Sequence, residues 1–197
     1  NRMITLTSDF GLKDPYVAEM KGVILTINPK ATIVDITHDI EKFNIRMAAF
    51  VLASAVSCFP KGTVHLAVVD PGVGTERRTI LVETKRSFFV GPDNGILMLA
   101  AKSQGIEHSY ELSNSNLMLP KTSTTFHGRD IFAPAAAFID KGTKPHDFGL
   151  EIKNPVISFF PAVERRNNVL TAEVLYIDGF GNIITNIQEK NMLNSQI

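Results

Sequence analysis

The sequence has 197 residues, 44% of them hydrophobic and 20% charged, which is ordinary for a soluble globular protein with one full domain and part of a second. Twenty lysines and arginines balance twenty aspartates and glutamates, so no net charge favours binding to nucleic acid or to an anionic membrane. Apolar runs such as Ile131–Ile139 are too short to cross a bilayer. The single cysteine, Cys58, excludes an internal disulfide and is typical of a cytoplasmic protein. It is expected to be a buried structural thiol.

Strand-like and helix-like patterns alternate over the first 155 residues. Short segments rich in β-branched and aromatic residues predict strands at Met3–Thr7, Thr32–Ile36, Val64–Val69, Thr79–Glu83 and Ser87–Val90. This alternation predicts a layered α/β domain over residues 1–155 with a mostly parallel central sheet.

Helices are expected between and after these strands. The first begins at Pro15, with Asp14 as its cap, and presents apolar residues on one face. The second covers residues 45–56 with Asn44 as its cap, and the third begins near Asp130.

The composition changes after Asn154, where prolines and a polar run predict a linker over residues 156–168. Beyond it, Val169–Ile177 and Ile183–Ile187 are expected to form two strands around a glycine-containing turn. Because a hairpin alone is barely stable, residues 169–197 are expected to be an incomplete C-terminal β domain.

Polar residues follow three of the predicted strands. Asp9 follows the first strand, Asp35 and His38 follow the second, and Asp70 follows the third. Ligands in parallel sheets bind at this edge, where Asp9 is suited to accept the two hydroxyls of a ribose. With Asp39 these residues also allow a metal cluster, but no compact ligand pattern such as HExxH supports it, so neither a metal nor a cofactor is expected.

The segment Val68–Arg78 reads VVDPGVGTERR. Its glycines suggest phosphate binding, but the segment lacks the Gly-Lys-Ser/Thr ending of a P-loop and precedes a strand rather than a helix. A tight turn with Asp70 and the paired arginines as surface charges is the alternative.

A second segment, Thr124–Pro134, reads TTFHGRDIFAP and places His127 just before a helix. Together with Asp70 and Arg77, this histidine offers a carboxylate, a permanent cation and an imidazole. Such a set can activate one water molecule: Asp70 or His127 accepts its proton, while Arg77 stabilises the hydroxide. Which of the two accepts the proton stays open, because coupled groups titrate together.

Three further side chains near these segments are suited to binding a ligand. Asp14 can pair with a ligand ammonium group as well as cap its helix. Tyr16 and Phe126 can contact a positively charged sulfonium through their ring faces, although plain packing also explains them.

Five motifs, taken in order, resemble the family of S-adenosyl-L-methionine (SAM) hydroxide adenosyltransferases: SDFG, VDPGVG-x-x-R, GPDNG, TFHGRD and DGFGN-x-x-TN. The resemblance runs from Ile4 to about Ile187 and implies an α/β N-terminal domain, a small C-terminal β-barrel and a homotrimer with active sites between subunits. It further implies attack of water on the 5′ carbon of the ribose, which releases adenosine and L-methionine without a metal or an added cofactor. Some members of the family act on the unnatural sulfonium epimer.

The resemblance also implies roles for individual residues. Asp70, Arg77 and His127 match the water-activating triad, and Asp9 matches the ribose-binding carboxylate. The remaining matches are expected to contact other parts of the substrate: Asp14 near the methionine amine, Thr125 and Phe126 at the reacting centre, and Asp178, Phe180 and Asn182 beside the methionine and the adenine.

Two other functions stay open. The chain is alternatively a module that binds adenosine or SAM without turnover, or a SAM-dependent halogenase. The resemblance implies that the halogenating relatives carry tyrosines in place of Asp70 and His127, and that fluorinating ones add a serine at Gly128. Because a carboxylate repels a halide whereas water needs a base and a cation, the sequence favours hydrolysis.

Overall fold

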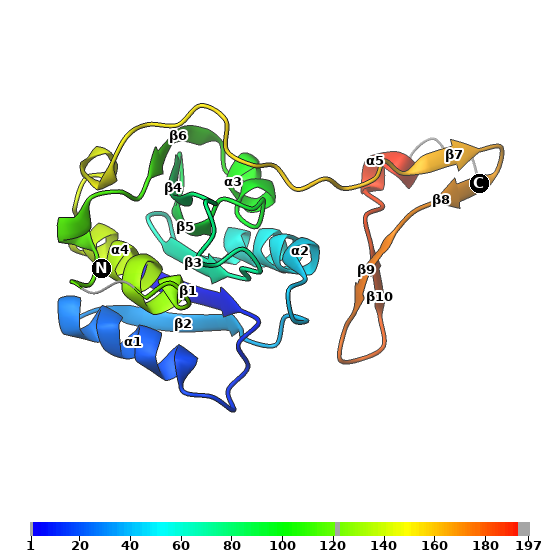
Figure 1. The fold of residues 1–197 in the computed structure, drawn as a ribbon. Helices are drawn as coiled ribbons and strands as arrows, with labels where there is room; N and C mark the ends of the chain where they lie inside the picture. Colours follow the sequence, from blue (N-terminus) through cyan, green and yellow to red (C-terminus); the bar gives the residue numbers. More distant parts are fainter. Residues whose placement is uncertain (1, 121–122, 193–197) are drawn as a thin grey trace. The chain divides into compact units, whose positions relative to one another are not determined.

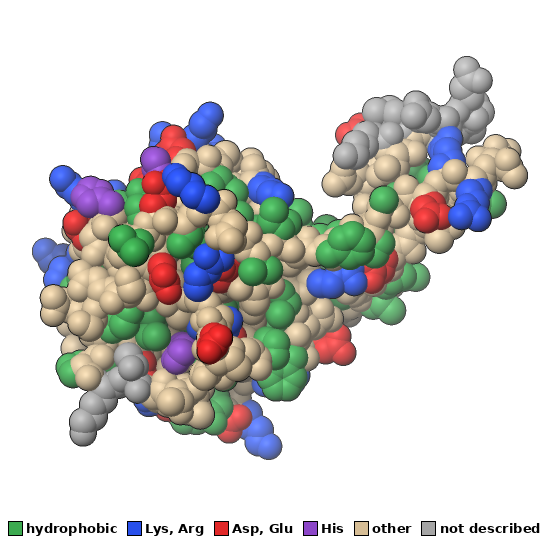
Figure 2. Space-filling view, turned by 45° about the horizontal axis from the view of Figure 1, so that its top comes forward, with side chains coloured by type: hydrophobic (Ala, Val, Ile, Leu, Met, Phe, Trp, Pro, Cys, Tyr) green, Lys and Arg blue, Asp and Glu red, His purple; other side chains and the backbone are tan. Residues whose placement is uncertain are grey.

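The computed structural model describes residues 2–120 and 123–192. Its contacts divide the chain into two units, Asn1–Ser158 and Phe159–Ile197, which are described separately below. Within the described residues, every helix is too short or too polar to span a bilayer. Acidic and basic side chains are interspersed on the face seen in Figure 2, in keeping with the net charge of zero.

The first unit is built on a sheet that, in the described residues, has six strands in the order β2-β1-β3-β5-β4-β6 (Figure 1). The strands are β1 (Met3–Ser8), β2 (Thr32–Thr37), β3 (Val64–Val68), β4 (Thr79–Thr84), β5 (Phe88–Pro92) and β6 (Ile106–Glu111). Neighbouring pairs among β2, β1, β3 and β5 are parallel, while β4 is antiparallel to β5 and to β6. The prediction of a mostly parallel sheet is confirmed.

Helices cover both faces of this sheet. On one face α1 (Tyr16–Ile27) packs beside α4 (Ala133–Lys141), and on the other α2 (Ile45–Ala55) packs beside α3 (Met98–Ser103) (Figure 1). Each face has its own cluster of buried apolar side chains, with Leu6 and Leu66 in one and Ala67 and Val69 in the other. All of β3 is buried, and its apolar side chains are divided between the two clusters because the pleat sends successive side chains to opposite faces of the sheet.

Of the two predicted helix caps, one is confirmed and one is wrong. Asn44 caps α2, because its side chain accepts a hydrogen bond from the Met47 N–H at 2.9 Å. The prediction that Asp14 caps α1 is wrong: Pro15 occupies the cap position, without a side-chain hydrogen bond. Ahead of α4, residues Gly128–Phe132 form a π-helical segment, a wider turn that often occurs at functional sites.

The second unit contains short antiparallel pairs. Strand β9 (Val174–Ile177) pairs with β10 (Ile183–Thr185), and β7 (Glu164–Arg166) pairs with β8 (Val169–Thr171), before helix α5 (Glu189–Met192). Residues 164–166, assigned to a linker from the sequence, therefore form a strand.

Two local expectations are corrected. The single strand expected over residues 169–177 is broken into β8 and β9, and Glu173, just before β9, donates its N–H to the side chain of Asn186. Cys58 is exposed rather than buried, since the chain leaves α2 through a 3₁₀ turn at Val56–Cys58.

Candidate functional site

The site lies where β1 and β3 end side by side. Ser8 is paired with Val68 in the parallel register, so Asp9 and Asp70 follow neighbouring strands at the same edge of the sheet. A cavity of about 340 Å³ opens there. Its lining combines the two strand ends with two other loops: Asp9, Phe10, Lys42, Phe43, Val68, Asp70, Val73, Thr125, Phe126, His127 and Gly128.

Asp9 is held in place by the loop before α2. Its Oδ2 accepts a hydrogen bond from the Phe43 N–H at 2.9 Å, and the Lys42 ammonium donates to its backbone carbonyl. Phe43 adopts a left-handed backbone conformation, with φ of 63°, which is unusual for a residue other than glycine. Lys42 and Phe43 were not identified from the sequence, which carries no signal for this conformation.

Asp70, Arg77 and His127 meet through the arginine. Arg77 Nε donates to Asp70 Oδ1 at 2.9 Å, Arg77 Nη2 donates to Asp70 Oδ2, and the same Nη2 lies 2.9 Å from His127 Nδ1. The side chains of Arg77 and Asp70 are only 10% and 5% exposed. They are therefore not solvated charges of a surface turn, and the structure brings together the three residues proposed from the sequence.

The contact with Arg77 determines which nitrogen of His127 carries the proton. A guanidinium can only donate, so Nδ1 must accept and a neutral imidazole has its proton on Nε2. Burial and the charge of Arg77 lower the pKa of His127, while Asp70, Asp130 and a hydrogen bond with the Ser123 backbone oppose that shift. The lowered pKa favours the neutral form at neutral pH.

The loop that carries Asp70 and Arg77 packs tightly against the loop that carries His127. Gly74 has a φ of +77°, and a Cβ atom placed on it would lie 2.3 Å from the Thr124 carbonyl oxygen. Only glycine fits this approach, so the Gly-Val-Gly sequence allows the two loops to come together rather than cradling a phosphate.

Aromatic rings cluster beside the cavity. The Phe126 ring lies 5.7 Å from that of Phe10 and 5.3 Å from that of Tyr16, both edge-on. Phe126 and Thr125 line the cavity, whereas Tyr16 is 45% exposed and, like the exposed Asp14, is not among the lining residues.

Asp35 and His38 belong to a separate group of polar contacts. Ser8 Oγ lies 2.7 Å from His38 Nδ1, and His38 Nε2 lies 3.1 Å from Asp35 Oδ1. The other carboxylate oxygen, Asp35 Oδ2, pairs with Lys21 at 2.6 Å. Asp35 is inside β2 rather than after it. In the described parts of the chain, no three His, Cys, Asp or Glu side chains gather in a way that would hold a metal ion.

The three candidates in the second unit share one turn between β9 and β10. Asp178 Oδ1 accepts from the N–H groups of Phe180 and Asn182, both at 2.9 Å, and its Oδ2 accepts from the Asn182 amide. The Asn182 side chain holds the pKa of Asp178 below its usual value. Phe180 is 95% exposed in this unit.

Comparison with known proteins places these features in a family. A family model described as the SAM hydroxide adenosyltransferase N-terminal domain matches residues 4–149. The (R)-S-adenosyl-L-methionine hydrolase of Salinispora arenicola is 41% identical over 183 residues, covering 91% of this chain and 70% of that protein. The crystal structure of an uncharacterized conserved protein from Thermotoga maritima matches with a TM-score of 0.90 at 44% identity, covering 94% of this chain and 71% of that one.

Fluorinases are more distant relatives. That of an Actinoplanes species is 26% identical over 219 residues, covering 98% of this chain and 74% of that protein. With its site at the ends of β1 and β3 inside the matched region, the chain belongs to the SAM hydroxide adenosyltransferase family.

Proposed function

We propose that this protein hydrolyses SAM to adenosine and L-methionine by directing water to the 5′ carbon of the ribose. The observation that carries the proposal is that Asp70 and His127 both line the cavity and are joined by Arg77. The relatives named (R)-S-adenosyl-L-methionine hydrolase support it and favour the R-configured sulfonium as the substrate.

The cavity suits the nucleoside part of this substrate. The carboxylate of Asp9 is already oriented by Phe43 and is placed to accept the ribose hydroxyls. Phe126 and Thr125 both line the cavity, and we assign them contacts with the sulfonium centre. We further propose that the other candidates bind the rest of SAM in a homotrimer with sites between subunits: Asp14 and Tyr16 from the first unit, and Asp178, Phe180 and Asn182 from the second.

In the proposed step, the water oxygen forms a bond to C5′ while the C5′–S bond breaks. The electron pair of that bond returns to sulfur, so methionine leaves as a neutral thioether. No metal or added cofactor is needed for this displacement, because the sulfonium is already a good leaving group and positioning does much of the remaining work.

The hydrogen bonds favour Asp70 as the group that accepts the water proton. The Nδ1 lone pair of His127 is occupied by Arg77, whereas a carboxylate has about four lone-pair sites and Arg77 uses two of them on Asp70. Arg77 is not among the lining residues, so its proposed roles are to orient both groups and to stabilise the developing hydroxide electrostatically.

Incubation with each sulfonium epimer in ¹⁸O-labelled water tests the proposal. We expect adenosine and methionine in equal amounts from the R epimer, with the label in the 5′ hydroxyl of adenosine. Asp70→Ala should lower kcat by about 10²- to 10⁴-fold, the range for general-base catalysis. Asp93→Ala is the matched control, because Asp93 is also buried and paired with an arginine, Arg78.

Three results would contradict the proposal. Full activity in Asp70→Ala would remove the carboxylate from the reaction. Tight binding of SAM without any product would show a binding module. A halogenated nucleoside that forms only when halide is added would show a halogenase.

A further inference from the structure

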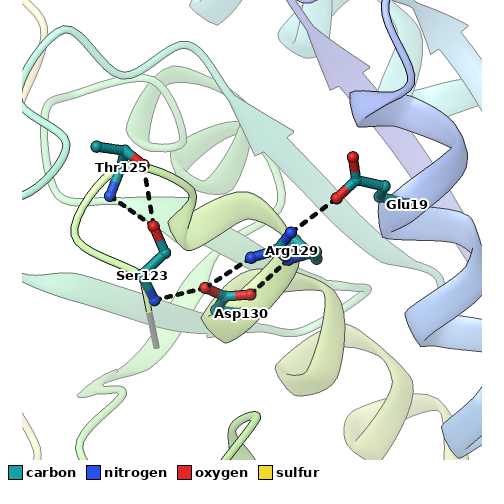
Figure 3. Close-up of polar contacts among 5 residues, drawn as sticks. All are labelled: Glu19, Ser123, Thr125, Arg129 and Asp130. Atoms are coloured by element: carbon teal, nitrogen blue, oxygen red, sulfur yellow. Dashed lines mark hydrogen bonds and ion pairs between the residues drawn. The ribbon is translucent and has the colours of Figure 1, made fainter. Parts of the chain in front are cut away.

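Asp130 is a buried carboxylate that contacts the loop carrying His127 and is not among the residues that line the cavity. Its side chain is 0% exposed. Asp130 Oδ2 accepts from the Ser123 N–H at 2.6 Å, and Arg129 donates to both carboxylate oxygens, from Nε at 2.7 Å and from Nη2 at 3.3 Å (Figure 3). A buried charge requires such partners, and here one partner is the backbone of the loop.

Arg129 connects this carboxylate to the rest of the fold. Its Nη1 donates to Glu19 Oε2 on α1 at 2.8 Å (Figure 3), and its guanidinium lies 5.2 Å from the centre of the Phe126 ring. Arg129 therefore spans from α1 to the start of the π-helical segment and covers an aromatic residue of the cavity wall. This fixes the position of Asp130 relative to the helix layer.

Ser123 connects Asp130 to the imidazole. Its hydroxyl lies 2.9 Å from the Thr125 hydroxyl and accepts from the Thr125 N–H at 3.0 Å, which closes a compact turn (Figure 3). The Ser123 backbone is also one of the groups that raise the pKa of His127.

We propose that Asp130 is a positioning residue: by holding Ser123 and the turn before His127, it keeps the imidazole in contact with Arg77. This role rests on the proposed hydrolysis for its effect on turnover. Its effect on the imidazole does not depend on turnover and can be measured separately.

The charges that surround His127 determine the expected pH dependence. Asp70 and Arg77 face it from the loop after β3, Asp130 from the π-helical segment, and Asp9 and Lys42 line the same cavity. Asp130 and the Ser123 backbone both raise the pKa of His127. Protonation of Nδ1 would break its hydrogen bond with Arg77, so the acid limb of the kcat profile should follow the pKa of His127. Loss of Asp130 should lower that pKa further and move the acid limb to lower pH.

The test compares Asp130→Asn with Asp93→Asn. Asp93 is also buried and also joins an arginine to a backbone N–H, but its partners are Arg78 and Val156, outside the loop of His127. In Asp130→Asn we expect kcat to fall about tenfold or more with KM within about twofold, because small misplacements of reacting groups are costly. The ¹⁵N signals of the His127 imidazole should lose the pattern of a single Nε2–H tautomer, whereas Asp93→Asn should keep both that pattern and the acid limb.

A second pair of variants tests the same contact from the loop. Ser123→Ala and Ser123→Pro both remove the hydroxyl, but only proline removes the N–H that donates to Asp130. Proline should reproduce the Asp130→Asn imidazole pattern, while alanine should not. Wild-type imidazole signals in Asp130→Asn and in Ser123→Pro, or equal changes in the Asp93→Asn control, would overturn the positioning role. Absence of hydrolysis by the wild-type protein would instead refute the proposed function.

Discussion

His65 makes the fold sensitive to acid, and the effect can be isolated in one variant. The ring is fully buried on β3, with Nδ1 2.8 Å from the Thr5 hydroxyl and its centre 5.0 Å and 5.6 Å from the rings of Phe89 and Phe59. Its Nε2 is buried and has no hydrogen-bond partner among the described residues. Burial lowers the pKa of His65 from 6.5 to about 4.

The sign of the effect follows from the two pKa values. Below pH 6.5 the unfolded chain takes up a proton at His65, whereas the folded protein does not until about pH 4. Proton uptake therefore stabilises the unfolded state as the pH falls through this window, and the folded state becomes less stable relative to it. At about 1.4 kcal/mol per pKa unit, the loss reaches about 3 kcal/mol near pH 4.

Urea unfolding at about pH 7 and about pH 4.5 measures this loss. In His65→Gln the polar contact with Thr5 can persist but the titration is removed, so the fall in unfolding free energy should be smaller than in the wild type by about 2 to 3 kcal/mol. His108→Gln is the control, because a hydrogen bond to Glu151 raises the pKa of His108, which stabilises the fold at low pH. An equal fall in wild type and His65→Gln would refute the assignment.

Two further changes test the site. Arg77→Lys should lower kcat by at least about tenfold, because a single ammonium cannot replace the guanidinium that reaches Asp70 and His127 together. Steady-state kinetics measures this change, and an unchanged kcat would contradict the geometry. Gly74→Ala should lower both the melting temperature and kcat, because its Cβ would collide with the Thr124 carbonyl oxygen at a φ of +77°; a variant with wild-type values of both would show that the loops are not in close contact.

The sequence predicted correctly those features that residues close together in the chain determine. The alternation of strands and helices predicted the parallel sheet, and therefore the edge at which Asp9 and Asp70 meet. Asn44 was predicted as a cap because it directly precedes α2. Asp14 looked equivalent, but the helix begins one residue later than its cap would require, since Pro15 takes the cap position.

Features that depend on tertiary contacts were not predicted. The left-handed conformation of Phe43 leaves no mark in the sequence, because the contact with Asp9 rather than a glycine selects it. Asp130 was identified only as the start of a helix, since its bond to Ser123 involves a backbone N–H. The residue types of Asp70, Arg77 and His127 suggested a shared site, but only the structure shows that Arg77 joins the other two.

The backbone strain at Phe43 has a consequence for ligand affinity. A left-handed conformation costs an ordinary residue about 1–2 kcal/mol, and folding of the surrounding loop supplies that free energy in advance. The carboxylate of Asp9 is therefore preorganised, and in its proposed role the ribose would not have to immobilise it. Less of the free energy of the contacts is then spent on ordering the side chain, so the net affinity is higher.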